Sequence, residues 1–542
     1  MAEKTDIYQY FIDYFDEHPH SGLGLACLVV VAIGTILSKR WRQKKRAQKR
    51  RKKRQKEAKA RTKLVHDKVA HIYDADDIVQ KPILELTDDL TSGQLTPIKV
   101  LNAFQNKALA VTNEINCVIE PITEAEEWAN ALEASATPKG LLYGIPISLK
   151  ENVAIEGYDS TLGTEVMIGD VSHQDSVIVK VLKNQGAIPF MRTNVPQTLL
   201  SIGSDNPIYG NTLHPHDPDR GPGGSSTGEG VLIGGGGSVI GIGTDVGGTL
   251  RVPAEFCGAF CLSPTRGRVS CDGLKSLVDG NPSVRQTFGP MARDFDSLVL
   301  ASRALLCPLM YDLDPTLAYM PFDDKQYEQT SPLRIGYFTS TGTIQCQPPN
   351  VRAVMEAKAA LEVMGHKVIP FDFPAIMGEP FDGEKYFLHL VLADRLRNVK
   401  DKLKHDRVIK HLDWSILFSR VPKWLLKLIK FIVKRVEEHS GSVLGALAGF
   451  GSIQDYFKRL EEVQVYKDKF LDTWRSLDLD AAICPVFPSP AVTLDTVTAA
   501  TREGFFIRHL SKDTQNWLNS MSEYDIDLSY STCDLEQQPQ YY

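Results

Sequence analysis

A glycine-dense stretch from residue 220 to residue 258 is the feature that most limits how this 542-residue chain can fold. Its glycines are interspersed with Val, Ile and Leu, a composition that packs rather than forming a flexible linker. Glycine permits tight turns and close approach of backbones, at an entropic cost. Two segments, "GPGGSSTGEG" (221–230) and "GTDVGGTLR" (243–251), place hydroxyl side chains at such turns. The stretch therefore predicts turns that present hydroxyl groups from a packed scaffold.

A lysine upstream offers the base that such hydroxyls need for nucleophilic catalysis. Lys150 ends "GIPISLK", a pattern that predicts a strand entered through a Gly-x-Pro turn. Burial lowers the pKa of a lysine and lets its neutral amine act as a base. A neutral lysine, a relaying serine and an attacking hydroxyl form a catalytic chain without histidine, and the N–H groups of residues 246–249 could bind an oxyanion. The alternative stays open, because glycine clusters more often serve packing and such a lysine usually lies on the surface.

Sites for cofactors and metals leave no convincing pattern. The chain has no phosphate loop of the Gly-Lys-Ser/Thr kind and no Gly-x-Gly-x-x-Gly. The segment "GSSTG" (224–228) formally matches a Gly-x-Ser-x-Gly elbow, but no clear strand precedes it. The thirteen histidines and nine cysteines show no spacing typical of a metal site or a disulfide framework. We therefore expect no cofactor and no metal.

An apolar segment near the N-terminus predicts a transmembrane helix. Residues 21–38 contain no charged side chain, and their length is near the lower limit for crossing a bilayer. An acidic segment, 1–20, precedes them and the positive charge follows, which is the reverse of a cleavable signal peptide. The positive-inside rule then places the N-terminus outside or in a lumen and the rest of the chain in the cytoplasm. A buried core helix is the alternative.

Residues 39–63 form a basic run within an otherwise acidic chain. The sequence has 61 Lys and Arg against 67 Asp and Glu, and sixteen of the basic residues but a single acidic one fall in this run. Three interpretations are open: contact with anionic lipid, binding of nucleic acid or a nuclear signal, and a charge block that fixes topology. The neighbouring apolar segment favours lipid contact and topology together, so we expect no nucleic-acid partner.

A second candidate membrane element spans residues 422–436. Its lysines at 423, 427, 430 and 434 share one narrow face of a helix, while Trp424 and further apolar residues cover the rest. This pattern is typical of a helix that lies in the membrane interface. A core helix with one solvated stripe is the alternative.

From residue 64 the sequence shows the alternating helix and strand patterns of an α/β protein. Several blocks resemble the amidase signature family, and most closely its membrane-anchored members that hydrolyse fatty-acid amides; among them are "GLLYGIPISLKENV", "FMRTNVPQTLLS", "GPGGSSTGEGVLIGGGGSVIGIGTDVGGTLRVPAEFCGAF" and "FGPMARDFDSL". The resemblance extends over about residues 77–492. It implies an amidase signature domain at 64–500, in which helices cover a twisted mixed β-sheet. The polar tail at 501–542 departs from the family.

The resemblance also implies the functional residues. The base is Lys150, the relay serine is Ser225, and the nucleophile position is occupied by Thr249, where the family has serine. Threonine keeps the hydroxyl, but its methyl group restricts χ1. The implied substrate-binding residues are Ser226, Val246, Gly247, Gly248 and Met191. We expect Asp245 and Arg251 to brace the turn as an ion pair.

The expected function is hydrolysis of fatty-acid amides, such as N-acylethanolamines and primary fatty amides, by a single-pass or monotopic protein of the endomembrane system whose catalytic domain faces the cytoplasm. The expected partners are the amide substrate, membrane lipid through 21–38, 39–63 and 422–436, and a second copy in a homodimer. Two alternatives stay open. One is a non-catalytic or weakly active relative that binds lipid amides. The other is a non-membrane amidase acting on small amides or on a charged transfer RNA.

Overall fold

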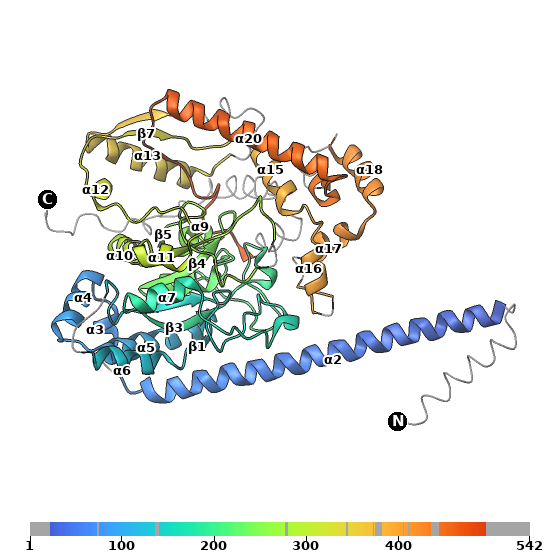
Figure 1. The fold of residues 1–542 in the computed structure, drawn as a ribbon, viewed down its shortest axis with the longest axis horizontal. Helices are drawn as coiled ribbons and strands as arrows, with labels where there is room; N and C mark the ends of the chain where they lie inside the picture. Colours follow the sequence, from blue (N-terminus) through green and yellow to red (C-terminus); the bar gives the residue numbers. More distant parts are fainter. Residues whose placement is uncertain are drawn as a thin grey trace, which may run out of the picture.

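The computed structural model describes residues 22–72, 75–135, 140–276, 280–342, 345–371, 373, 382–404, 406–409, 412–434 and 444–494. The acidic segment 1–20 and the polar tail 501–542 lie outside the described residues. Figure 1 shows an α/β body with one long helix, α2, running along its edge and extending beyond it. The mixed sheet covered by helices that the sequence predicted is confirmed.

The main sheet has six strands in the order β1-β3-β2-β4-β6-β5. Strand β2 runs parallel to both β3 and β4, whereas β1, β5 and β6 pair antiparallel with their neighbours. The strands are β1 (Val118–Pro121), β2 (Pro146–Lys150), β3 (Ile188–Thr193), β4 (Ile240–Asp245), β5 (Phe260–Cys261) and β6 (Thr287–Ala292).

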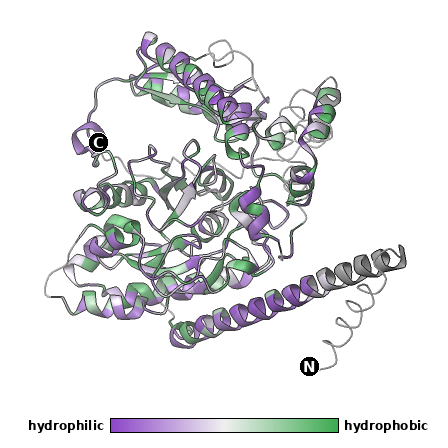
Figure 2. Cartoon of the chain, turned by 45° about the vertical axis from the view of Figure 1, so that its right-hand side comes forward, coloured by the Kyte–Doolittle hydropathy of each residue, from purple (hydrophilic) through white to green (hydrophobic). Residues whose placement is uncertain are grey.

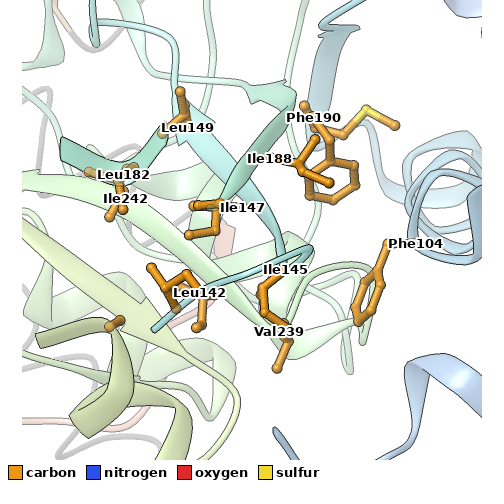
Figure 3. Packing of buried hydrophobic residues seen from close by; sticks show 14 of the residues in the cluster. Phe104, Leu142, Ile145, Ile147, Leu149, Leu182, Ile188, Phe190, Val239 and Ile242 are labelled. Carbon is orange, nitrogen blue, oxygen red and sulfur yellow. The ribbon is translucent and has the colours of Figure 1, made fainter. Parts of the chain in front are cut away.

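Every residue of β2, β3, β4 and β6 is buried. Strands covered on both faces are expected to be apolar almost throughout, and Figure 3 shows Ile147 and Leu149 of β2 packed among Leu182, Ile188 and Ile242. Polar side chains on these strands must therefore find partners inside the protein, because no water is available to them. Lys150 is one such side chain.

Helices surround this sheet. The pair α8 and α9 contact each other, α7 and α10 contact each other, and α5 packs on α6; a member of each pair also contacts the sheet. These helices, with their neighbours, are α3 (Ala75–Val79), α4 (Ile83–Ser92), α5 (Pro97–Ile115), α6 (Ala125–Glu133), α7 (Val177–Asn184), α8 (Thr227–Gly234), α9 (Arg251–Cys257), α10 (Phe295–Leu305), α11 (Pro308–Leu313) and α12 (Asp324–Tyr327). Local sequence sets their ends: Thr96 caps α5 through Lys99 N–H, with proline at the next position.

A second, parallel sheet has the strand order β8-β7-β9. Its strands are β7 (Arg334–Tyr337), β8 (Lys367–Pro370) and β9 (Ala481–Ile483). The helices of this later part of the chain are α13 (Pro348–Val363), α15 (Asp382–Val391), α16 (Arg397–Lys402), α17 (Asp413–Arg420), α18 (Lys423–Lys434) and α20 (Ile453–Ser476). Figure 1 shows α13 and α20 over this small sheet, and α16 to α18 at one end of the body.

Helix α2 (Gly22–Val69) is a single helix of 48 residues that crosses the boundaries predicted at 38/39 and 63/64. Its C-terminal part packs on the body, and one stripe of side chains faces inward: Ala47, Arg51, Arg54, Ala58, Arg61, Val65 and Val69. Their spacing of three or four residues keeps them on one helical face. Figure 2 shows the polar character of the central part of this helix.

Three arginines of the basic run thus bind the protein itself, which corrects the expectation that the whole run serves lipid contact. Arg51 forms an ion pair of 2.6 Å with Glu165, and Arg61 one of 2.5 Å with Glu120. Arg54 is buried between Glu120 and Asp159. The physical reason is that the acidic groups of the body lie opposite the inward stripe of the helix and compensate buried charges that would otherwise be costly.

Among the described residues, no helix contains an apolar stretch long enough to cross a membrane. The predicted transmembrane segment 21–38 begins outside the described residues, and the side chains of residues 22–33 also lie outside them. This segment stays a prediction.

Candidate active site

Lys150 lies at the end of β2, with its side chain fully buried. Its Nζ atom is 2.9 Å from Ser225 Oγ, 2.9 Å from Ser226 Oγ and 2.7 Å from Thr244 Oγ1. The two serines precede α8 and Thr244 belongs to β4, the neighbour of β2. Three hydroxyl oxygens from two other segments therefore fix the amine in one position.

Burial lowers the pKa of Lys150 to about 7, although nearby carboxyl groups, Asp245 first among them, act in the opposite direction. A lysine in water keeps its proton far above neutral pH. The lowered pKa makes the neutral amine accessible at neutral pH, and a neutral amine can accept a proton from a hydroxyl group.

The serine turn is held against β4. Ser226 Oγ donates to the carbonyl oxygen of Thr244 at 3.1 Å and accepts the Thr244 N–H at 3.1 Å. Glycine is required just before it: a Cβ on Gly224 would lie 2.5 Å from the carbonyl oxygen of Gly203. The Gly224–Ser225 peptide bond is cis. Ser225 is thereby left with its hydroxyl beside Lys150 and facing the site cavity.

Thr249 lies in the turn between β4 and α9. Its hydroxyl donates to the Thr244 carbonyl oxygen at 2.9 Å and accepts the Val246 N–H at 3.3 Å. Among the described residues these are its two hydrogen-bond partners, so the hydroxyl is turned into its own loop and is not bonded to Ser225.

Asp245 and Arg251 brace this turn, as the sequence suggested. Asp245 accepts the N–H groups of Gly248 at 2.8 Å and Leu250 at 3.2 Å, and Arg251 Nε lies 3.1 Å from its carboxylate. Burial raises the pKa of Asp245, but the bonds from Arg251 and the backbone outweigh it and lower the pKa overall. Asp245 is therefore ionised and acts through position rather than through proton transfer.

Two of the four backbone donors proposed for an oxyanion remain available. The N–H groups of Val246 and Gly248 are bonded within the turn. Within the described part of the chain, the N–H groups of Gly247 and Thr249 have no hydrogen-bond acceptor. Gly247 also lies against the ring of Phe387 from α15, since a Cβ at this position would come within 2.5 Å of that ring.

A small cavity lies beside the serine turn and the turn that carries Thr249, with room for about one water molecule. It is lined by Ser225, Thr244, Val246 and Thr249 together with Thr198, Leu199, Leu200, Ser276 and Gln286. Thr198 and Leu199 adopt φ values of 71° and 60°, a strained conformation for residues other than glycine and one that is found preferentially at functional sites.

Some of the predicted site residues lie at this cavity and others do not, and some residues at the cavity were not predicted. The structure brings together Lys150, Ser225 and Ser226. Ser225, Val246 and Thr249 line the cavity, whereas Gly247 and Gly248 are not among its lining residues. Met191 is fully buried on β3 within the core and does not line this cavity. Sequence reasoning missed Thr244, although it is a hydroxyl residue of the segment "GTDVGGTLR" (243–251). It also missed the part of the cavity wall formed by 198–200, Ser276 and Gln286, which no local sequence pattern predicts.

The chain also resembles known proteins along most of its length. Residues 99–516 match the family model described as "Amidase". "Fatty-acid amide hydrolase 1" of Sus scrofa is 37% identical over 488 residues, which are 89% of this chain and 82% of that relative. "Vitamin D3 hydroxylase-associated protein" of Gallus gallus is 40% identical over 378 residues, which are 70% and 81% of the two chains. A solved structure described as "Fatty acid amide hydrolase" has a TM-score of 0.69 at 23% identity, with 84% and 81% covered, and shows the shared fold.

Proposed function

The chain belongs to the amidase signature family of amide hydrolases, and from this premise we propose that it hydrolyses fatty-acid amides to a fatty acid and an amine. The observation that carries the proposal is the contact between buried Lys150 and Ser225, which places a base of lowered pKa 2.9 Å from a relay hydroxyl. The Sus scrofa relative, described as "Fatty-acid amide hydrolase 1", supports the choice of substrate class.

The reaction proceeds in two halves. Thr249 rotates out of its turn, and neutral Lys150 accepts its proton through Ser225 as Oγ1 attacks the amide carbonyl. The N–H groups of Gly247 and Thr249 stabilise the oxyanion that forms. Ser225 then passes a proton to the leaving amine, and an ester remains on Thr249. Water attacks this ester, the base takes the proton of that water, and the fatty acid leaves as the Thr249 hydroxyl is restored.

The cavity has room for about one water molecule in this conformation, and we propose that its wall moves to admit an acyl chain. The strained segment at Thr198 and Leu199 is the part of the wall where a change of backbone conformation would release strain.

We further propose that the body associates with membrane lipid through α17 and α18. Trp424, Leu428 and Phe431 on α18 are 68%, 51% and 58% exposed, and Leu417 on α17 is 52% exposed. The opposite side of α18 is anchored by Leu426, which is fully buried. Large apolar side chains gathered on one helical face are typical of an interfacial helix.

The outward face of α2 is a second candidate for lipid contact, because it carries many positive charges. Among the side chains that the structure describes, its exposed Lys and Arg residues are Lys39, Arg42, Lys44, Lys45, Arg46, Lys49, Arg50, Lys52, Lys53, Lys56, Lys59, Lys63 and Lys68. Each cation near an anionic leaflet adds about 1 kcal/mol of attraction. Together with the predicted helix at 21–38, this face supports a location on the cytoplasmic side of an endomembrane.

One observation favours a second function, binding of a lipid amide without turnover. The Thr249 hydroxyl is bonded within its own loop rather than to Ser225. A nucleophile displaced by about 1 Å loses on the order of 10²-fold in rate. A chain whose threonine cannot rotate would hold the substrate and leave it intact.

The full-length chain in detergent micelles tests both functions. A long-chain N-acylethanolamine and acetamide are supplied, and released acid is measured by mass spectrometry. Hydrolysis of the long-chain amide alone, lost in Thr249→Ala, supports the proposed activity. Saturable binding of the long-chain amide without release of acid supports the second function. Equal turnover by Thr249→Ala and the wild type contradicts the mechanism.

Flotation with vesicles tests the membrane surface. The chain should be shortened only by residues 1–38, because residues from Ala47 onward pack on the body. Trp424→Glu with Phe431→Glu should reduce flotation. The matched control, Val363→Glu with Met364→Glu, alters side chains that are 88% and 71% exposed at the end of α13 and should leave flotation unchanged. Equal flotation by both double variants would exclude α18 as the contact.

A further inference from the structure

Glu229 is a fully buried carboxyl that the proposed reaction does not use. It lies on α8, and its Oε1 and Oε2 atoms are 2.7 Å from Thr193 Oγ1 and 2.6 Å from Ser148 Oγ. Both partners belong to the surroundings of Lys150: Ser148 precedes it by two residues on β2, and Thr193 is its partner in the register with β3. The carboxyl is therefore held by β2, which carries the lysine, and by the neighbouring strand β3.

The sequence makes room for this carboxyl. Gly241 of β4 pairs with Ser148 of β2, and a Cβ at Gly241 would lie 1.9 Å from Glu229 Oε2 and 2.6 Å from Ser148 Oγ. Any side chain at this position would expel the carboxyl. The site is thus a built pocket for one carboxyl group rather than a chance burial.

A count of hydrogen atoms indicates the protonation state of Glu229. Ser148 Oγ contacts Glu229 Oε2 and also Ser238 Oγ, at 3.1 Å, while Ser238 Oγ contacts the carbonyl oxygen of Ile240 at 2.8 Å. These three contacts in a row need three hydrogens, because a carbonyl oxygen can only accept. The two serines supply two. A protonated Glu229 that donates to Ser148 supplies the third and satisfies all three contacts, whereas an ionised Glu229 leaves one of them without a hydrogen.

The charges around Glu229 agree with this count. Burial raises its pKa to about 7, and this effect outweighs the side-chain contacts with Ser148 and Thr193 and the nearby Lys150, which act in the opposite direction. On its other side, the Cys117 thiol is kept protonated by burial, which raises its pKa to about 12. Asp245 and Glu151, the other carboxyls that act on Lys150, are associated with Arg251 and with Arg192. No cation of the described residues forms an ion pair with Glu229.

We propose that Glu229 is a positioning residue for the reaction: a neutral carboxylic acid that ties β2 to β4 through Ser148 and Ser238 and leaves Lys150 without a counterion. An ionised carboxylate beside the lysine would favour the ammonium form and remove the base. A neutral acid provides the same geometry without that charge. The effect on Lys150 rests on the proposed function, whereas the protonation of Glu229 does not.

Infrared difference spectroscopy tests the protonation without any turnover. The spectrum of the wild type minus that of Glu229→Gln is recorded at pH 6, where an ordinary glutamate is ionised. The expected result is the carbonyl stretch of a protonated carboxyl, shifted in deuterated water. A difference that shows only carboxylate bands overturns the proposal, whether or not the chain hydrolyses amides.

The pH dependence of turnover tests the effect on Lys150. It is measured in the wild type or, if the wild type shows no turnover, in Thr249→Ser. Glutamine keeps a neutral donor and acceptor, so Glu229→Gln should retain turnover within about threefold and the same acidic limb. Glu229→Leu, which removes the hydrogen bonds, should lose about 10²-fold, as expected when the base is misplaced. Glu255→Gln removes another buried carboxyl of raised pKa, bonded to Asn350, and serves as the matched control.

Two outcomes would overturn the role. If Glu229→Gln raises turnover about tenfold at pH 6, the native carboxylate had been charged and had held a proton on Lys150. If Glu229→Gln loses as much as Glu229→Leu in a folded preparation, the negative charge itself is needed.

Discussion

The two halves of the active site use their hydrogen bonds in different ways. On the base side, Lys150 is bound by hydroxyl groups from two other segments of the fold, and Ser226 is locked to the backbone of β4. On the nucleophile side, the Thr249 hydroxyl is satisfied within its own turn, by Thr244 and Val246. The hydrogen bonds of the first half hold the groups that transfer a proton, whereas those of the second half stabilise the turn itself.

This difference shows which part of the site controls its activity. The base half depends on contacts between β2, β4 and the serine turn; the two strands belong to the buried sheet, and the turn is bonded to β4. The nucleophile half depends on one rotamer of one side chain, and a threonine has less freedom at χ1 than a serine. Hydrogen bonds in a site without substrate often align only when substrate binds, so the resting rotamer adds a barrier to the reaction but does not by itself abolish activity.

Removal of the base should have the largest effect. Lys150→Met keeps an unbranched apolar stem but removes the amine that contacts Ser225, Ser226 and Thr244. Loss of a general base costs about 10²- to 10⁴-fold, so turnover of a long-chain amide should fall to the background. The measurement is acid release by a preparation whose circular dichroism matches the wild type. Retention of more than a tenth of the activity would show that the base half does not control the reaction.

Removal of the Thr249 methyl group, in the nucleophile half, should have the next largest effect. Thr249→Ser removes the methyl group and frees χ1, so turnover should rise, by up to about 10²-fold if misalignment of the hydroxyl limits the wild type. Labelling by a fluorophosphonate probe should accelerate in parallel. The double variant Thr249→Ser with Lys150→Met is the control, and it should label slowly. An unchanged or lower rate in Thr249→Ser would show that the threonine rotamer is not limiting.

The pH profile should report the base half alone. Lys150 must be neutral to accept a proton, and burial lowers its pKa to about 7. Below that pH the ammonium form dominates, so kcat/KM should fall about tenfold per pH unit, and above it the rate should level off. Thr249→Ser should raise the whole profile without moving its midpoint. A midpoint near that of an ordinary lysine would contradict the buried base.

The sequence allowed the family and the kind of sheet to be predicted because both are encoded in contiguous blocks. Glycines at 223, 224 and 247 and the hydroxyls beside them are local signals, and so is Lys150 at the end of an apolar strand. The rotamer of Thr249 was not predictable. It depends on two backbone groups that come within reach only once the turn has closed.

Contacts between distant segments were the other part that the sequence could not provide. The basic run at 39–63 was interpreted as a surface for lipid, yet Arg54 is buried against Glu120, 66 positions further along the chain. The number of charges does not show which of them face the body. The helical spacing of Ala47, Arg51, Arg54 and Ala58 identifies the inward face of the helix, but only once the acidic body is known to lie beside that helix. The cavity wall at 198–200 was missed for the same reason.

The smallest expected effect concerns the brace of the nucleophile turn. Arg251 is half exposed, with 50% of its side chain accessible, whereas Asp245 is buried and also accepts two backbone N–H groups of the turn. Arg251→Gln removes a partly solvated ion pair, worth about 0.2–1 kcal/mol, so turnover should fall by no more than about fivefold. Asp245→Asn replaces an acceptor oxygen by a donor facing those N–H groups and should cost more. The measurement is turnover by the two variants in parallel assays. If Arg251→Gln loses more activity than Asp245→Asn, the turn is held mainly by the partly exposed ion pair. The backbone hydrogen bonds to Asp245 would then contribute less to the turn that holds the Thr249 hydroxyl.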